Sequence, residues 1–185
     1  CMVISRFDKT PGYIPIGSAI TSYARNFTIR AGQANYENVC YFDTDSMHIE
    51  GNVENVKNVT IDSVNFNCWK LETKWDEAIF TRQKTYIEHV THKGYKKLDT
   101  PYHDIKCAGM GNKAKEALNA SFNGQTIEAK DKNNLNQMQI EEFTRIKRDY
   151  SDFKPGLKVP GNLRSKVIVG GTVLYEDYFK LRDTE

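Results

Sequence analysis

Two aspartates lie two positions apart in the segment Tyr41-Phe42-Asp43-Thr44-Asp45-Ser46. Carboxylates this close repel each other, and removing them from water without a counter-cation would be costly. A hard divalent cation such as Mg²⁺ resolves that conflict, because it takes oxygen ligands and often accompanies substrate phosphates. Two other interpretations stay open. Asp and Ser are ordinary residues of a solvated surface turn, and Asp-x-Asp also fits a metal-dependent glycosyltransferase that uses a nucleotide sugar.

The residues around these acids predict how they are held. Short β-prone runs at 39–42 and 47–49 flank them, which predicts a hairpin with the acids at its tip. Upstream, apolar residues recur every three or four positions and predict a helix over 16–36, with Ser18 as a possible N-cap. The apolar stripe of this helix consists of Ile16, Ala19, Ile20, Tyr23, Ala24, Phe27, Ala31 and Ala34.

The remaining elements are expected to be short. The β-prone runs are 3–15, 78–90, 95–98, 105–108, 167–174 and 178–181, and His92-Lys93-Gly94 is expected to form a turn. Asn112 can cap a short helix over 113–118, and 138–147 is a second candidate helix. The polar, Asn-rich stretch 119–137 is expected to be a loop or an insertion.

Composition excludes several classes of protein. The chain has 185 residues, of which 39% are hydrophobic and 27% charged, so it is neither disordered overall nor collagenous, and no apolar run is long enough to span a bilayer. The four cysteines are far apart in sequence, which argues against a zinc knuckle or a redox dithiol; we expect them to be reduced and buried. The four histidines show no zinc-ligand spacing.

The hexapeptide in its context resembles motif C of the family B DNA polymerases. Other segments follow in that family's order: 20–25 is similar to the helix before motif C, and 82–87 to the Lys-x-Tyr segment that contacts primer-terminus DNA. Segments 106–115 and 159–179 resemble the beginning and end of the thumb. These similarities point to the protein-primed subgroup, which small tailed bacteriophages and some linear plasmids encode.

The resemblance implies catalytic roles for the two acids. Asp45 would bind metal directly, and Asp43 would tune the site or join the coordination. The reaction would be two-metal nucleotidyl transfer from a deoxynucleoside triphosphate to a primer 3′-hydroxyl, with Mg²⁺ as the cofactor. The third acid of motif A and the lysine of motif B precede motif C in the family and are not in this chain. We therefore expect a fragment of a longer DNA-directed DNA polymerase that is inactive alone.

DNA contacts follow from the same resemblance. Lys84 and Tyr86 would project from one face of one strand toward the sugar-phosphate backbone. The other candidate contacts are Lys106, Lys113, Lys115 and Arg25. Stretches 82–115 and 145–166 each carry a surplus of five positive charges, which suits duplex phosphates. Ordinary alternatives are a solvated basic face, a Tyr86 that packs in a core, and an exposed Arg25 on an amphipathic helix.

These inferences predict an α+β fold with two parts. Residues 1–107 would be the C-terminal half of a polymerase palm, with a small antiparallel sheet and one long helix, and residues 108–185 a small thumb. Expected partners are primer-template DNA, deoxynucleoside triphosphates and a terminal priming protein, with no membrane, in the cytoplasm of a bacterial host. A non-catalytic module that binds duplex DNA is the alternative function, and the glycosyltransferase is a more distant one.

Overall fold

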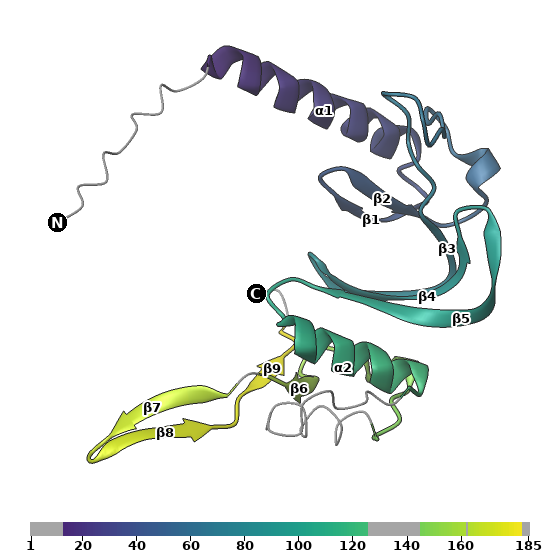
Figure 1. Ribbon diagram of the computed structural model, residues 1–185. Coiled ribbons are helices and arrows are strands. Elements are labelled where there is room, and N and C mark those ends of the chain that lie inside the picture. Colours follow the sequence, from purple (N-terminus) through teal and green to yellow (C-terminus); the bar gives the residue numbers. More distant parts are fainter. Residues whose placement is uncertain (1–12, 126–144, 162, 183–185) are drawn as a thin grey trace. The chain divides into compact units, whose positions relative to one another are not determined.

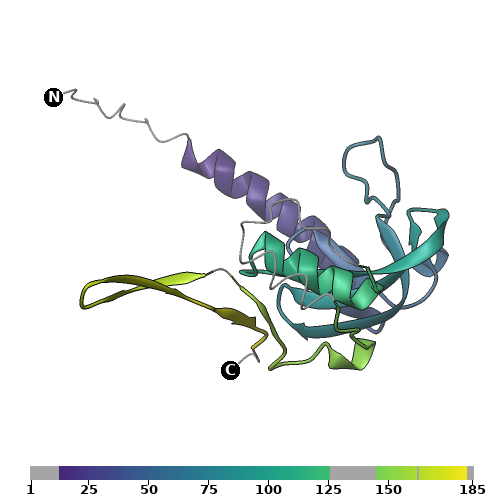
Figure 2. The same cartoon turned by 60° about the horizontal axis from the view of Figure 1, so that its bottom comes forward.

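The computed structural model describes residues 13–125, 145–161 and 163–182. These residues form two compact units (Figures 1 and 2). Of the described residues, the first unit comprises 13–61 together with 65–69, and the second comprises 62–64 and those from 70 onward. Helices and antiparallel sheets occupy separate stretches of the chain, so the predicted α+β class is confirmed.

The first unit is built from one long helix and one hairpin. Its elements are α1 (Ile14–Ala34), β1 (Val39–Asp43), β2 (Ser46–Ile49) and the short 3₁₀ helix η1 (Val53–Asn55). The hairpin packs on the end of α1 at Gly32, where a Cβ would lie 3.2 Å from the ring of Phe42. The buried Asn35 ties the end of α1 to the loop that follows η1, because its side-chain amide bonds both the main-chain N–H and the C=O of Lys57 at 2.8 Å.

Most of the apolar stripe of α1 is exposed. The predicted helix is confirmed, although it begins at Ile14, with Pro15 in its first turn, so Ser18 is not its N-cap. Of the predicted stripe only Ala31 is buried, whereas Tyr23 is 77% exposed. Among the described residues, Phe27 has one aromatic neighbour, the stacked ring of Trp69 at 5.6 Å. The stripe therefore supplies little of the first unit's own core.

The second unit is centred on a three-stranded antiparallel sheet in the order β3-β4-β5. Its first elements are β3 (Thr73–Arg82), β4 (Thr85–Lys93), β5 (Lys96–Cys107) and α2 (Asn112–Asn123). They are followed by η2 (Tyr150–Asp152), β6 (Lys158–Pro160), β7 (Arg164–Ile168), β8 (Gly171–Tyr175) and β9 (Tyr178–Lys180). Strand β6 pairs with β9, and β7 pairs with β8 in a separate ribbon whose residues are all exposed.

One hydrophobic core joins the sheet, α2 and the C-terminal segments. Strands β4 and β5 contribute Ile87 and Ile105, α2 contributes Leu118, and Phe153 and Leu181 come from beyond it; each is 0–1% exposed. Burying a side chain of this size stabilises a fold by about 1.5–3 kcal/mol. The core therefore ties residues on both sides of position 107 into one cooperative body.

Several predicted boundaries are wrong. The run 78–90 is not one strand, because the chain turns back at Gln83 and Lys84, and the runs 95–98 and 105–108 belong to the single strand β5. The run 167–174 likewise contains the turn between β7 and β8. Helix α2 extends past the predicted 113–118 into the stretch expected to be a loop, and it ends where Gly124 adopts a left-handed conformation. The predicted elements at 3–12, 126–137 and 138–144 lie outside the described residues.

The described cysteines only partly follow the prediction of burial. Cys107 is buried, Cys68 is intermediate and Cys40 is exposed, and all three are free thiols. Burial raises the pKa of the Cys107 thiol, although its hydrogen bond with Thr85 and the nearby cations Arg82 and Lys115 oppose that shift. No helix among the described residues is long and apolar enough to cross a membrane.

Candidate active-site hairpin and basic surface

The two acids lie at a hairpin tip, as the sequence predicts. Asp43 ends β1 and pairs with Ser46 at the start of β2, so Thr44 and Asp45 alone form the turn. The Ser46 hydroxyl donates to the main-chain carbonyl of Asp43 at 3.2 Å and closes the turn. A two-residue connection is the tightest common hairpin, and it holds both carboxylates within one short, strand-bordered segment.

The two carboxylates have different surroundings. Asp43 is half-buried, and its Oδ1 accepts a 3.0 Å hydrogen bond from the Thr44 hydroxyl. Its Oδ2 accepts a longer bond, 3.4 Å, from the phenol of Tyr41. Asp45 is exposed. The hairpin therefore holds one carboxylate in place through hydroxyl donors and presents the other to solvent.

The turn is strained at Thr44. This residue has a φ of +35°, a conformation that β-branched residues rarely adopt. Asn, Asp and Gly populate this region far more easily. Residues held in such conformations cost about 1–3 kcal/mol and concentrate at functional sites. The strain marks this turn as a candidate site independently of its charge.

The hairpin can supply only part of a metal site. Its two carboxylates are hard oxygen donors of the kind that Mg²⁺ binds, but Mg²⁺ demands about six ligands in octahedral geometry. In the described ranges, no group of three or more His, Cys, Asp or Glu side chains is placed to hold a metal ion. The donor set thus fits a shared site, in which water, substrate phosphate or another carboxylate completes the shell.

Lys84 and Tyr86 do not share a strand face, contrary to the prediction. Lys84 lies in the turn between β3 and β4 with a φ of +58°, whereas Tyr86 lies within β4. The main-chain carbonyl of Lys84 accepts a 2.9 Å bond from the N–H of Ala108, which anchors the turn to the end of β5. The correction concerns the geometry that places these side chains, and their contact with DNA stays a prediction.

Tyr86 and Lys106 are brought together by strand register. They are directly paired across β4 and β5. The ring of Tyr86 packs against Phe80 of β3, with 5.5 Å between ring centroids. The exposed Lys106 forms a 3.0 Å ion pair with the half-buried Asp104 on its own strand. The face thus combines an aromatic ring, a cation and a competing anion.

The remaining predicted contacts lie on the two helices. Lys113 is exposed and Lys115 half-buried in the first turns of α2, and Lys115 is close enough to Cys107 for its charge to favour the thiolate. Arg25 is exposed on α1 of the first unit.

A basic cavity in the second unit was not predicted from the sequence. It has a volume of about 630 Å³ and lies between the C-terminal end of β3, the start of α2 and the C-terminal strands. The residues that line it include Arg82, Arg164, Lys180 and Arg182 together with the glycines 109, 111 and 161. We call the four cations the basic cluster. Arg82 and Arg164 fall within the two basic stretches noted in the sequence; Lys180 and Arg182 fall outside both.

One carboxylate partly offsets the basic cluster. Asp177 lines the same cavity and pairs with the Nε of Arg164 at 2.5 Å. The wall is also closely packed, because a Cβ on Gly161 would lie 3.0 Å from the main-chain oxygen of Asp177. Arg164 is the one member of the basic cluster that Asp177 pairs with. The other three, Arg82, Lys180 and Arg182, have no carboxylate within ion-pair distance in the described part of the chain. Such a concave, cationic and glycine-lined surface suits phosphate groups.

Comparison with known proteins gives consistent matches. No family model matches the chain. The DNA polymerase of Streptococcus phage Cp-1 is 31% identical over 175 residues, which is 95% of this chain and 24% of that polymerase. The DNA polymerase of Bacillus phage phi29 is 39% identical over 120 residues, or 60% of this chain and 21% of the polymerase. The chain thus spans about a quarter of the length of the curated relatives that it matches.

Solved structures agree with the sequence matches. Phi29 DNA polymerase complexed with primer-template DNA superposes with a TM-score of 0.63 at 28% identity, over 93% of this chain and 27% of that one. The same polymerase complexed with primer-template DNA and incoming nucleotide substrates gives a TM-score of 0.62 at 27% identity. The chain is therefore similar in both sequence and fold to a portion of these phage enzymes.

Proposed function

We propose that this chain, a relative of the phi29-type phage DNA polymerases, is the part of a DNA-directed DNA polymerase that carries a catalytic hairpin and a surface that binds duplex DNA. The intact protein would add deoxynucleotides to a primer 3′-hydroxyl in protein-primed replication. The observation that carries the proposal is the strained two-residue turn that presents Asp45 beside a hydroxyl-anchored Asp43, in a chain that matches these polymerases over nearly all its length.

In this proposal the two acids have separate tasks. Asp45, which is exposed at the tip, would bind Mg²⁺ directly. Asp43, held by the Thr44 hydroxyl at 3.0 Å, would fix the angle at which the turn presents its neighbour and add a further negative charge. When bound, a pair of Mg²⁺ ions would supply the charge that activates the primer hydroxyl and stabilises the leaving pyrophosphate. A motif A carboxylate outside this chain would complete the site.

The basic surface would hold the duplex that the reaction extends. Tyr86 and Lys106 lie side by side on β4 and β5, so a ring and a cation can meet the same stretch of sugar-phosphate backbone. Lys84, Lys113 and Lys115 would add phosphate contacts on the second unit. Arg25, on α1 of the first unit, is a separate proposed contact with DNA. Contacts of this kind set position and affinity without reading sequence, which suits an enzyme that must copy any template. Residues 1–107 would then serve as palm and 108–185 as thumb.

Primer extension tests the proposal. A protein that contains this chain together with the upstream polymerase motifs should extend a primer on a template with Mg²⁺ and deoxynucleoside triphosphates, whereas the 185-residue chain alone should bind the duplex without extending it. Robust extension by the chain alone would contradict the shared metal site. Failure of the longer protein to extend any primer would contradict polymerase function.

A non-catalytic module that binds duplex DNA is the second candidate, because the basic cavity stands on its own residues. The two functions separate at Asp45. In the longer protein, Asp45→Ala should abolish extension and leave duplex binding intact if the hairpin is catalytic. Extension that persists in the variant would favour the module.

A further inference from the structure

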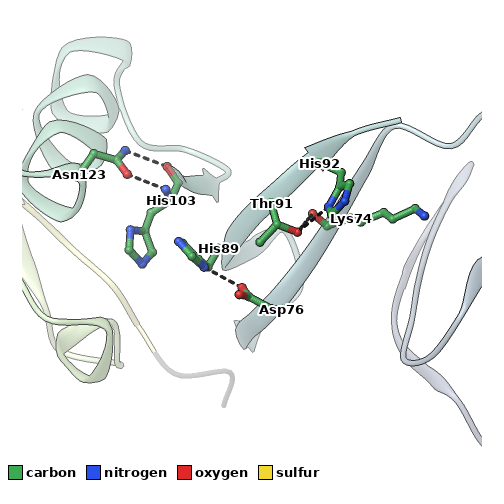
Figure 3. A network of polar contacts seen from close by, with 7 residues as sticks. All are labelled: Lys74, Asp76, His89, Thr91, His92, His103 and Asn123. Atoms are coloured by element: carbon green, nitrogen blue, oxygen red, sulfur yellow. Dashed lines mark hydrogen bonds and ion pairs between the residues drawn. The ribbon is translucent and has the colours of Figure 1, made fainter. Parts of the chain in front are cut away.

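Two asparagines of α2 hold the edge of the three-stranded sheet. Asn123 accepts from the N–H of His103 at 2.5 Å and donates to its C=O at 3.0 Å, and Asn119 accepts from the N–H of Ile105 at 3.0 Å. Asn119 and Asn123 lie four residues apart and so on one face of the helix. The C-terminal turn of α2 is therefore attached to β5 at His103 (Figure 3).

Three rings lie around the half-buried imidazole of His103. His89 of β4 lies directly across the strand pair, with ring centroids 4.9 Å apart. The rings of Phe122, from α2, and Tyr150, from η2, lie 5.9 and 5.7 Å away. A single imidazole thus contacts three of the elements that make up the second unit.

The two histidines differ in their access to negative charge. His89 Nδ1 lies 2.6 Å from Asp76 Oδ1 on β3, and Figure 3 shows the two groups facing each other. In the described ranges no carboxylate lies within ion-pair distance of His103. His89 therefore has a carboxylate partner in Asp76, whereas a proton on His103 would place a positive charge where no described carboxylate lies within ion-pair distance.

The other groups around the pair do not remove this imbalance. Glu77 of β3 and Asp76 act on His103 from a distance, and Glu88 of β4 acts with them on Tyr150. Helix α2 contributes only the uncharged Asn123 and Phe122. Burial, with the three carboxylates, raises the pKa of the Tyr150 phenol, so this side chain stays neutral throughout the range in which histidines titrate.

We propose that His103, whose ring lies beside that of His89, forms a proton-sensitive joint that holds the C-terminal turn of α2 against β5 while the His103 ring is neutral and releases it when that ring takes up a proton. The inference concerns the stability of the second unit and does not depend on the proposed function. Loss of the joint would loosen the C-terminal turn of α2 before the rest of the core opens, because Asn123 attaches that turn to β5 through the main-chain N–H and C=O of His103.

The direction of the pH effect follows from the position of His103. Burial, and then the charge of His89, lowers the pKa of His103 below its ordinary value, against the opposing effects of Asn123 and the two acids. A histidine with a lowered pKa binds its proton less readily in the folded chain than in the unfolded one. Its contribution to the free energy of unfolding is complete above the unfolded pKa of about 6.5 and is lost as pH falls through the lower folded value.

Amide hydrogen exchange on the full chain between pH 7.5 and 5.0 tests the joint. After correction for intrinsic exchange, protection of residues 120–123 should fall more than that of Ile87, since the lowered pKa of His103 makes proton uptake favour the open form. In His103→Gln, which cannot take up a proton, the extra loss should disappear. His92→Gln, on the same strand as His89, is the matched control and should behave like the parent chain.

Proton NMR of the imidazoles keeps the proposal falsifiable if His103→Gln does not fold. His103 in the unaltered chain should titrate below pH 6.5, and the Asn123 side-chain resonances should shift with the same midpoint. A His103 midpoint at or above 6.5, or protection of residues 120–123 that falls in parallel with Ile87, would overturn the joint.

Discussion

Tyr86 and Lys106 are paired across β4 and β5, and Lys106 forms an ion pair with Asp104, two residues earlier on its strand. Tyr86 and Lys106 are predicted to promote DNA binding, whereas the negative charge of Asp104 is predicted to oppose it. It also allows predictions of opposite sign at neighbouring positions.

Removing the anion beside Lys106 should strengthen duplex binding. Asp104→Asn keeps the shape of the side chain and removes a negative charge that lies 3.0 Å from the ammonium, so Lys106 becomes free to meet a phosphate. Lys106→Ala should weaken binding and reduce the slope of log affinity against log salt by about 1. Fluorescence anisotropy with a labelled primer-template measures both changes.

Lys96→Ala is the matched control, because Lys96 is exposed at the opposite end of the same strand. It should leave the affinity and the salt slope close to those of the parent chain. Equal losses in Lys96→Ala and Lys106→Ala would show that only net charge matters and would contradict a defined contact at Lys106.

The basic cluster should contribute several phosphate contacts. Lys180→Ala and Arg182→Ala should each lower duplex affinity uniformly across sequences, and the double variant should reduce the salt slope by about 2, since each neutralised phosphate contributes about 0.9. Arg164→Ala should have a smaller effect, because its guanidinium already pairs with Asp177 at 2.5 Å. Anisotropy titrations at several salt concentrations decide this, and an unchanged slope in the double variant would exclude the cavity from the interface.

Asp45→Asn should separate chemistry from binding. In a polymerase that contains this chain and a motif A acid, the substitution would remove the carboxylate that we propose binds metal. A charged metal ligand supplies several kcal/mol of transition-state stabilisation, so the extension rate should fall by at least about a hundredfold. Duplex affinity measured without metal should stay within about twofold. Single-turnover primer extension gives the rate, and an extension rate near that of the parent would contradict a ligand role for Asp45.

Thr44→Asn should relieve strain and disturb the site. Asn tolerates a positive φ better than a β-branched residue does, so the free energy of unfolding should rise by about 1 kcal/mol. The change also removes the hydroxyl that bonds Asp43, so extension by the longer protein should slow. Urea unfolding and primer extension measure the two effects, with Thr60→Asn as a control at an exposed position that is not among the described non-glycine residues with a positive φ.

The hairpin and α1 could be predicted from the sequence because each depends on local information. Alternating β-prone residues flank Asp43 and Asp45, and an apolar period of three to four marks the helix. The burial of α1 could not be predicted, since periodicity identifies the apolar side of a helix without identifying what covers it. Gly124 ends α2 in a left-handed conformation, and a glycine at that position indicates a helix end at Asn123, beyond the predicted range 113–118.

The turn at Lys84 could not be read from the sequence. Tight turns are usually marked by Gly, Pro, Asn or Asp, and here Gln83 and Lys84 stand between two β-prone runs, so the segment looks like one strand. Tertiary contacts hold the turn instead, including the bond from the Ala108 N–H to the Lys84 carbonyl.

The basic cluster could not be predicted from the sequence for a related reason. Arg82 and Arg164 are about eighty residues apart, Arg164 and Arg182 about twenty, and only the folded chain makes them neighbours.

Strand β5 is twelve residues long and forms a border of its sheet. Without Asn119 and Asn123, part of its outward amide and carbonyl row would be open to pairing with a strand of another molecule, which is a common beginning of fibrillar aggregation. By bonding the main-chain groups of His103 and Ile105, the two side chains leave fewer of the edge groups of β5 open to a strand from another molecule.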